Sequence, residues 1–423
     1  MTASKQGKMA IFPPTTPLKA KIRLPGSKSI TNRALLIASL ANGQSILSGI
    51  LKSDDTIVMA KALRLMGVDI SDLSEPVVHI NASGKLQAAR QPLFLGNSGT
   101  STRFLAASAA LVNGKTIIDG DEDMQKRPIE PLVNALNSIG VNCTSKTGCP
   151  PLTIISNGKP SGTHVSIDAS LSSQYISALL MIGPCLNHPF TVSFGQGERI
   201  GARGYVDLTL EIMRDFGAKI TENSSNSWTI MPTGYKARQY NIAPDYSSIT
   251  YLWAINKLVK ADLDLYPLDG INSQPDARAF KYIEQFPNMD NVIDGSQMQD
   301  AIPTLAVLAA FNNKPVKFIG IENLRVKECD RIEALSKGLN AISNGLATEI
   351  GNDLIINANP NLKSPKNPVL IDTYNDHRIA MSFALAGLKL NNILIDNPMC
   401  VSKTFASYWE VLVQMGVKLE FIK

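Results

Sequence analysis

LPGSKSITNRALL, residues 24–36, is the stretch whose pattern recurs along the chain. Its Pro-Gly pair stops a preceding strand, because proline lacks a backbone donor and glycine allows a tight turn. Ser27 or Ser29 can then cap a helix, which an apolar stripe extends over residues 30–40. The stretch therefore predicts a strand, a turn and a buried helix in direct succession.

Two cations lie at the start of this helix, where the helix dipole opposes positive charge. Lys28 and Arg33 stand at and just inside the first turn. With the free backbone N–H groups and the serine hydroxyls, they suit a bound phosphate or carboxylate. A single helix start does not exclude the alternative, which is an ordinary capped helix with two solvated basic residues.

Size and composition indicate a globular protein of two domains. The 423 residues are 44% hydrophobic and 18% charged, and such a length exceeds what one hydrophobic core usually serves. The net charge is +5, but Lys and Arg are dispersed along the chain. Because nucleic-acid-binding proteins usually concentrate their basic residues, we expect small anionic substrates and no nucleic-acid partner.

Cysteine usage and hydropathy bear on location. The five cysteines are odd in number and include no Cys-x-x-Cys pair, so we expect reduced thiols and no structural metal. Residues 1–20 lack the apolar core of a signal peptide, and no run reaches 18 apolar residues. We therefore expect a cytoplasmic protein that does not contact a membrane.

A unit of polar cluster, apolar helix, turn, strand, second helix and strand occurs six times. Unit starts are spaced by roughly 70–76 residues, except for a shorter fourth unit. Several second helices end at a glycine, as a helix C-terminus prefers. This order predicts an α/β fold with helices buried against mixed sheets, and residues 240–246, which contain Pro244, are the expected crossing between halves.

Polar residues fall at the start of each unit's first helix. If the pseudo-symmetry of the units directs these starts to one region, their dipoles add and attract anions. Capping explains the Ser, Asn and Asp residues there, but not the cations Lys28, Arg33, Arg103 and Arg378 in the first turns. The six starts are residues 26–29, 97–100, 172–174, 245–248, Asp300 and residues 375–378.

Eight motifs, in this order, resemble those of the 5-enolpyruvylshikimate-3-phosphate (EPSP) synthase family. The resemblance covers nearly the whole chain. The motifs are LPGSKSITNR (24–33), LGNSGT (95–100), RP (127–128), SSQ (172–174), DA (300–301), NLRVKECDR (323–331), YNDHR (374–378) and KTF (403–405).

The resemblance implies a two-domain, pseudo-threefold enolpyruvyl transferase fold built from six βαβαββ-type repeats. One domain would span residues 24–240, and the other residues 1–23 with 241–423. The implied reaction transfers the enolpyruvyl group of phosphoenolpyruvate to the 5-hydroxyl of shikimate 3-phosphate and releases phosphate, in the shikimate pathway. It requires no cofactor and no metal, and we expect a monomer that glyphosate inhibits in competition with phosphoenolpyruvate.

The resemblance also assigns residues to the two substrates, whose phosphates and carboxylates call for fixed cations. For shikimate 3-phosphate these are Lys28, Ser29, Arg33, Ser172, Ser173, Gln174, Tyr205, Asp300, Asn323 and Lys327. For phosphoenolpyruvate they are Lys28, Gly99, Arg127, Gln174, Arg331, Arg378 and Lys403. At Gly99 a side chain would also block close approach of a ligand.

Catalysis needs a base for the 5-hydroxyl and an acid for the methylene carbon of phosphoenolpyruvate. The resemblance assigns Asp300 as the base and Glu328 as the acid, with Lys28 as a second candidate for the proton transfer. Asp300 alone would fit a helix cap equally well, and Glu328 alone a solvated charge. Lys327 and Arg331 beside Glu328 favour its charged form, which does not suit an acid.

Three departures from the family pattern concern local geometry. Gly201 or Ala202 stands where the family usually has a substrate-binding serine, although Tyr205 can still stack on the substrate ring. Pro244 replaces a usual glycine, and Phe104 replaces a proline found in many members.

Three rival functions are weaker. A sister transferase acting on UDP-N-acetylglucosamine typically carries a reactive cysteine before its Arg-Pro pair, and residues 120–127 contain none. An inactive anion-binding module would be expected to lose Asp300, Glu328 or the arginines. An RNA-end-processing relative is disfavoured by the dispersed charge and the 6% aromatic content.

Overall fold

The computed structural model describes residues 7–169, 172–195, 202–268 and 274–422. The chain forms two compact units. The first unit is Gly26–Ala243, and the second joins Met1–Pro25 to Pro244–Lys423. The division falls within the Pro244-containing stretch that the sequence marked as a crossing.

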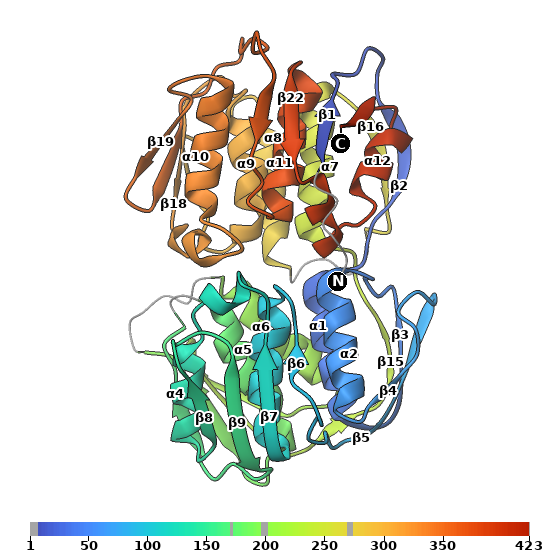
Figure 1. Cartoon of the computed structure of the whole chain (residues 1–423), viewed down its shortest axis with the longest axis vertical. Coiled ribbons are helices and arrows are strands. Elements are labelled where there is room, and N and C mark those ends of the chain that lie inside the picture. Colours follow the sequence, from blue (N-terminus) through green and yellow to red (C-terminus); the bar gives the residue numbers. More distant parts are fainter. Residues whose placement is uncertain (1–6, 170–171, 196–201, 269–273, 423) are drawn as a thin grey trace. The chain divides into compact units, whose positions relative to one another are not determined.

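Within its described residues, the first unit forms three sheets around central helices (Figure 1). Its helices are α1 (Lys28–Leu40), α2 (Asp54–Leu65), α3 (Gly99–Ser108), α4 (Glu130–Ser138), α5 (Ser173–Ile182) and α6 (Gly204–Asp215). Its strands are β3 (Ala41–Ser48), β4 (Asp69–Ile70), β5 (Val77–Ser83), β6 (Leu93–Phe94), β7 (Asn113–Asp119), β8 (Asn142–Ser145), β9 (Leu152–Asn157), β10 (His164–Ser166), β11 (Phe190–Ser193), β12 (Ile220–Ser224), β13 (Ser227–Ile230), β14 (Tyr235–Lys236) and β15 (Gln239–Asn241).

The second unit repeats the same design. Its helices are α7 (Tyr246–Val259), α8 (Ala279–Gln285), α9 (Ile302–Ala309), α10 (Arg331–Ile342), α11 (His377–Lys389) and α12 (Tyr408–Gln414). Its strands are β1 (Lys8–Ile11), β2 (Lys19–Arg23), β16 (Asp262–Tyr266), β17 (Val292–Asp294), β18 (Val316–Ile319), β19 (Ala347–Ile350), β20 (Asp353–Ile356), β21 (Val369–Ile371), β22 (Ile393–Asp396) and β23 (Leu419–Ile422). Short 3₁₀ turns η1–η7 cover Ala109–Leu111, Met124–Lys126, Gly183–Cys185, Pro275–Arg278, Gln299–Ala301, Glu322–Val326 and Pro398–Lys403.

Strand pairing confirms the repeat. In the order β6-β7-β9-β8, the first pair is parallel and the next two are antiparallel. The orders β10-β11-β13-β12 and β17-β18-β20-β19 follow the same rule. Strand β1 completes the last repeat by pairing with β22 and β23, so the N-terminus belongs to the second unit. In the part of the short fourth repeat that the structure describes, the parallel pair β16–β2 is formed.

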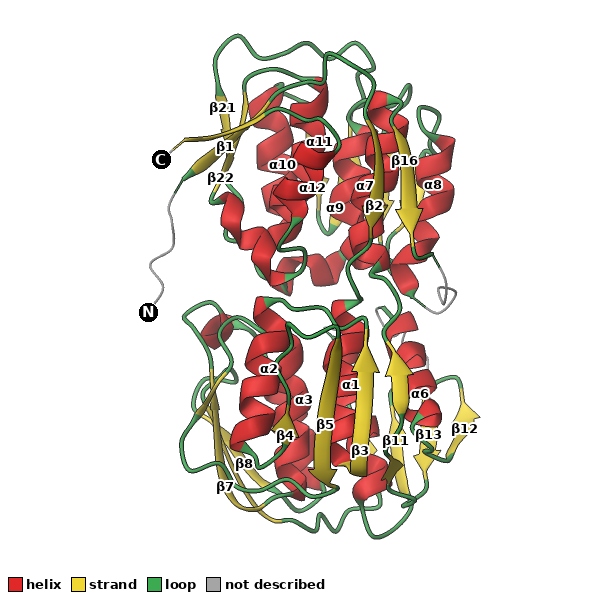
Figure 2. Ribbon diagram, turned by 90° about the vertical axis from the view of Figure 1, so that its right-hand side faces the viewer, coloured by secondary structure: helices red, strands yellow, loops and turns green. Residues whose placement is uncertain are grey.

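Each unit's core lies between its sheets and its central helices. Helix α3 is buried over its whole length, and α1 and α5 nearly so. In the second unit α9 and α11 are similarly enclosed. Figure 2 shows, in each unit, strands lying outside these helices. A helix buried on all sides can offer polar groups only at its ends, which places functional side chains at the helix starts.

Candidate active site

The first unit gathers Lys28, Arg33, Arg103 and Arg127, which we call the cation cluster. Ser27 caps α1, and its Oγ accepts the N–H of Ile30 at 3.5 Å. Lys28 is therefore the first residue of the helix, and its Nζ lies 3.3 Å from Asp55 Oδ2 at the start of α2. Capping thus fixes one catalytic candidate beside a carboxylate that the sequence did not single out.

Arg33 is 2% exposed and donates only to neutral oxygens. Its Nε donates to Thr209 Oγ1 at 2.7 Å, its Nη1 to the carbonyl of Ser29 at 3.0 Å, and its Nη2 to the carbonyl of Tyr205 at 3.2 Å. Burial lowers the pKa of Arg33 to about 10, since no carboxylate of the described residues pairs with it. At neutral pH the residue is a buried positive charge held by dipoles.

Gln174 connects two helix starts of this unit. Its Oε1 accepts Arg103 Nη1 at 3.1 Å, and its Nε2 donates to Thr100 Oγ1 at 3.1 Å. Arg103 Nη2 also donates to the carbonyl of Pro128 at 3.1 Å, and Arg127 Nη1 lies 3.2 Å from Asn97 Oδ1. The starts of α3 and α5 and the Arg-Pro pair therefore form one hydrogen-bonded group.

Gly99 is the first residue of α3, against two of these arginines. A Cβ atom there would lie 2.4 Å from Arg103 Nη1 and 2.9 Å from Arg127 Cζ. A side chain at this position would therefore displace the two arginines before it met a ligand. This is a second physical reason for a glycine here, beside the close approach of a ligand that was inferred from the sequence.

The second unit gathers Asp300, Glu328 and Asp376 around Arg331, which we call the carboxylate cluster. Arg331 is 1% exposed. Its Nη1 lies 3.0 Å from Asp300 Oδ1, its Nη2 2.8 Å from Glu328 Oε2, and its Nε 2.8 Å from Asp376 Oδ2. Burial acts to lower the pKa of Arg331, but Asp376, Glu328 and Asp300 raise it above its ordinary value.

Two further cations complete this cluster. Arg378 Nη2 lies 2.9 Å from Asp300 Oδ2, so the two Asp300 oxygens are held by different arginines. Lys403 Nζ lies 3.2 Å from Glu328 Oε1. The Asp300 side chain is nevertheless 19% exposed, so part of this carboxylate is accessible to solvent.

Helix caps position the cluster. Asp376 caps α11 by accepting the N–H of Arg378 at 2.8 Å, while the same side chain holds Arg331. Asp330 caps α10 through the N–H of Glu333, and its other oxygen lies 2.7 Å from Arg325 Nη1. Each cap thus does a second task by orienting a cation. Asp300 itself is no helix cap, since it lies in the η5 turn before α9.

The remaining predicted residues divide between the units. Ser172 caps α5, Ser173 is the first residue of that helix, and Tyr205 lies in α6. In the second unit Asn323 lies in η6 and is 3% exposed, with no hydrogen-bond partner for its Oδ1 among the described residues. Lys327 follows that turn directly.

The structure describes some of the positions at which the sequence departs from the family pattern. Gly201 lies outside the described residues, whereas Ala202 is described and has a φ of 55°. The Phe104 ring lies 5.1 Å from the Arg33 guanidinium, so the residue that replaces a proline stacks against a cation.

Asp55, Asp376 and Arg103 are contacts that the sequence did not assign to the site. Asp376 appeared in the sequence only within a helix start and the YNDHR motif, and Arg103 only as an unexplained first-turn cation. Closeness to cations in the sequence was the only sign that these residues belong to the site. The residues that they contact lie tens of residues away along the chain. Among the described residues, no helix is long and apolar enough to cross a membrane.

Known proteins resemble this chain over nearly its whole length. The family model described as EPSP synthase (3-phosphoshikimate 1-carboxyvinyltransferase) matches residues 13–265 and 276–412. A protein of that name from Rhizobium leguminosarum bv. trifolii is 54% identical over 414 residues, which is 98% of each chain. One from Pseudomonas savastanoi pv. phaseolicola is 54% identical over 415 residues, 98% of this chain and 99% of the relative.

Solved structures agree in fold. An EPSP synthase from Acinetobacter baumannii superposes with a TM-score of 0.81 at 24% identity, covering 99% of this chain and 100% of that one. The enolpyruvyl transferase NikO from Streptomyces tendae gives 0.78 at 16% identity, covering 99% of both chains. The predicted enolpyruvyl transferase fold is thereby confirmed. The chain belongs to the EPSP synthase family.

Proposed function

We propose that this transferase moves the enolpyruvyl group of phosphoenolpyruvate to the 5-hydroxyl of shikimate 3-phosphate, releasing phosphate, with binding and acid–base work divided between the two clusters. Family membership over nearly the whole chain supports the reaction. The division of work rests on the different partners of the two clusters. The cation cluster is held largely by neutral groups, whereas the carboxylate cluster is held by ion pairs.

The cation cluster is suited to binding. Both substrates are anions, and a buried guanidinium with dipole partners such as Arg33 attracts them without first breaking an ion pair. With it we assign Lys28, Ser29, Ser172, Ser173, Gln174 and Tyr205 to shikimate 3-phosphate, and Gly99 and Arg127 to phosphoenolpyruvate. In the second unit Asn323 and Lys327 join the first group, and Arg331, Arg378 and Lys403 join the second.

The carboxylate cluster is suited to proton transfer. Asp300 takes the proton of the 5-hydroxyl, because two arginines keep it ionised while part of it stays exposed. Glu328 delivers a proton to the methylene carbon. Its cation partners Arg331 and Lys403 are those assigned to phosphoenolpyruvate, so a bound substrate anion would draw them away and raise the proton affinity of Glu328. Lys28 is the alternative proton donor.

The observation that carries the proposal is the placement of Asp300 between Arg331 and Arg378. Phosphate release measured with each substrate alone and with both tests it. We expect release only with both, and no release when UDP-N-acetylglucosamine replaces shikimate 3-phosphate. Release without an acceptor, or with the nucleotide sugar, would contradict the proposal.

Two further expectations concern the protein as a whole. We propose that it works as a monomer, because the residues assigned to both substrates and to proton transfer all belong to this one chain. We propose a cytoplasmic location, since the five cysteines are free thiols. Sedimentation of the full chain measures the first of these.

A further inference from the structure

A pocket lies at the end of the first unit where its central helices finish, remote from the cation cluster. It is about 690 Å³ in volume and is lined by Leu40, the last residue of α1, whereas Lys28 is the first. At 1.5 Å per residue, α1 separates the two by roughly 20 Å. The volume lies within the usual range of small-molecule sites.

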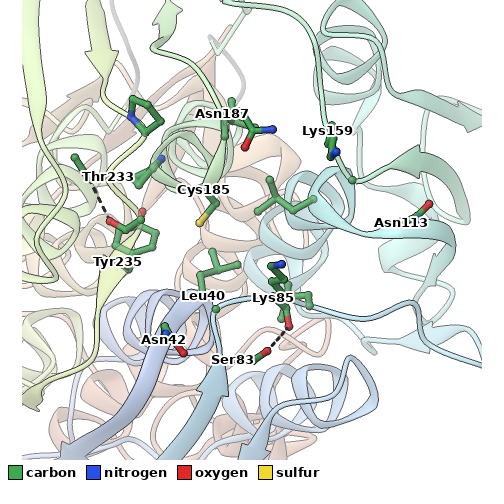
Figure 3. Close-up of a pocket in the computed structure, with 18 of the residues that line it drawn as sticks. Leu40, Asn42, Ser83, Lys85, Asn113, Lys159, Cys185, Asn187, Thr233 and Tyr235 are labelled. Atoms are coloured by element: carbon green, nitrogen blue, oxygen red, sulfur yellow. Dashed lines mark hydrogen bonds between the residues drawn. The ribbon is translucent and has the colours of Figure 1, made fainter.

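The three repeats of the unit build this pocket from equivalent corners (Figure 3). Each corner contains the C-terminal end of an α-helix or a 3₁₀ helix. An asparagine follows that end two residues later, and the three asparagines are Asn42, Asn113 and Asn187. Each also supplies a turn centred on a glycine. The three turns are Ser83-Gly84-Lys85, Asn157-Gly158-Lys159 and Thr233-Gly234-Tyr235.

The turns are held in place. Their glycines have φ values of +74°, +76° and +64°, which other residues rarely adopt. Asn157 Oδ1 accepts the N–H of Lys159 at 2.9 Å, and Ser83 Oγ donates to the carbonyl of Lys85 at 3.3 Å. The backbone that carries both lysines is therefore ordered before any ligand arrives.

The charge of the pocket has one sign. Lys85 and Lys159 are its only charged lining residues within the described chain, and no described carboxylate lies within 4.0 Å of either ammonium group. Both lysines are exposed, whereas Leu40, Leu86 and Leu186 are buried. Cys185 adds no negative charge, because burial raises the pKa of its thiol to about 12.

We infer that this pocket binds a small organic anion with an apolar body, such as an aromatic carboxylate. The two lysines and the asparagine amides would hold the anionic group at the rim. The apolar body would lie against the leucines below. The helix-end carbonyls there disfavour negative charge, so the anion is kept at the rim and the ligand has one orientation.

Equilibrium dialysis with 2-naphthoate as the probe tests this inference. The dialysis uses the full chain with saturating shikimate 3-phosphate, so that catalytic cations are already occupied. We expect one bound probe per chain, with affinity that falls as salt is raised. Probe binding seen only when shikimate 3-phosphate is left out would place the probe at the catalytic residues and overturn the inference.

Variants locate the probe. Lys85→Gln with Lys159→Gln should weaken binding about tenfold, whereas Lys61→Gln with Lys146→Gln, equal in charge but outside the pocket, should not. Cys185→Phe should abolish binding by filling the space while keeping both lysines. All three should retain normal phosphate release. Equal affinity in the lysine pair and its control would overturn the assignment, as would normal binding by Cys185→Phe.

Discussion

Arg33 and Arg331 are both fully buried arginines, yet the protein surrounds them in opposite ways. Arg33, in the first unit, donates to hydroxyl and carbonyl oxygens, and burial lowers its pKa to about 10. Arg331, in the second unit, contacts three carboxylates, which raise its pKa. The first arrangement leaves a buried positive charge that no carboxylate of the described residues neutralises. The second arrangement pairs the positive charge with carboxylates of the same unit.

The largest expected difference is in stability. Arg331→Met would leave Asp300, Glu328 and Asp376 without their shared cation, and breaking a buried ion pair costs about 3–5 kcal/mol. Arg33→Met removes a buried charge that has no carboxylate partner, so we expect a cost of about 1 kcal/mol. Thermal unfolding of the two variants measures the difference. Equal losses would show that the contrast in partners has no energetic meaning.

Turnover should respond to Asp300. Asp300→Ala is expected to lower kcat at least about 100-fold, because the 5-hydroxyl loses its base. Arg378 and Arg331 remain paired with other groups or with substrate, so the fold should persist, as circular dichroism would show. A variant with near-normal kcat removes Asp300 from the mechanism.

Gly99→Ala tests the first unit by steric means. The new Cβ would push against Arg103 and Arg127, so we expect KM for phosphoenolpyruvate to rise about tenfold with a smaller change in kcat. Glyphosate, whose phosphonate and carboxylate resemble the ends of that substrate, should compete with it and lose more affinity in the variant. Equal loss for both ligands would show that Gly99 does not discriminate between them.

Arg325 supports the second unit from outside the cluster. It joins Asp330, the cap of α10, to Glu349 Oε2 at 3.2 Å and Asn352 Oδ1 at 3.1 Å. Arg325→Lys keeps the charge but loses the planar geometry, so the loop bearing Glu328 should loosen and kcat fall about tenfold. As a positioning residue it should also shift the pH profile of kcat. An unchanged profile would reduce Arg325 to a purely structural role.

Cys329 should have the smallest effect. Its Sγ lies 3.6 Å from Asp376 Oδ2, and burial, followed by Asp376, raises the pKa of its thiol. The folded protein therefore keeps a neutral thiol where the unfolded chain would ionise, and this contribution to stability is lost only as pH rises above about 9. Cys329→Ala should change kcat by less than about threefold, and iodoacetamide should label Cys329 slowly at pH 8. Rapid labelling would contradict the predicted protonation.

Much of this architecture could be predicted from local sequence. Helix starts, caps and terminal glycines depend on neighbouring residues, so Ser27, Asp245 and Gly67 could be interpreted directly. The repeat predicted mixed sheets, whereas the pairing of individual strands came only from the structure. The α/β class and the six repeats were therefore accessible without coordinates.

Which charged residues contact one another could not be predicted from the sequence. Arg33 meets Thr209 across 176 residues, and Arg378 meets Asp300 across 78, and such contacts arise only from packing. The sequence showed Asp376 as a cap but not as the second holder of Arg331. For the same reason it could not show that a Cβ at Gly99 would meet two arginines.

Calorimetric binding of shikimate 3-phosphate to Arg33→Met and Asp300→Asn, beside turnover of the same proteins, tests the division of work most directly. We expect Arg33→Met to weaken binding at least about tenfold, since a buried cation is lost. Asp300→Asn should bind nearly as tightly as the parent while losing turnover at least about 100-fold. If Asp300→Asn lost binding and Arg33→Met did not, the assignment of shikimate 3-phosphate binding to Arg33 and of proton transfer to Asp300 would be contradicted.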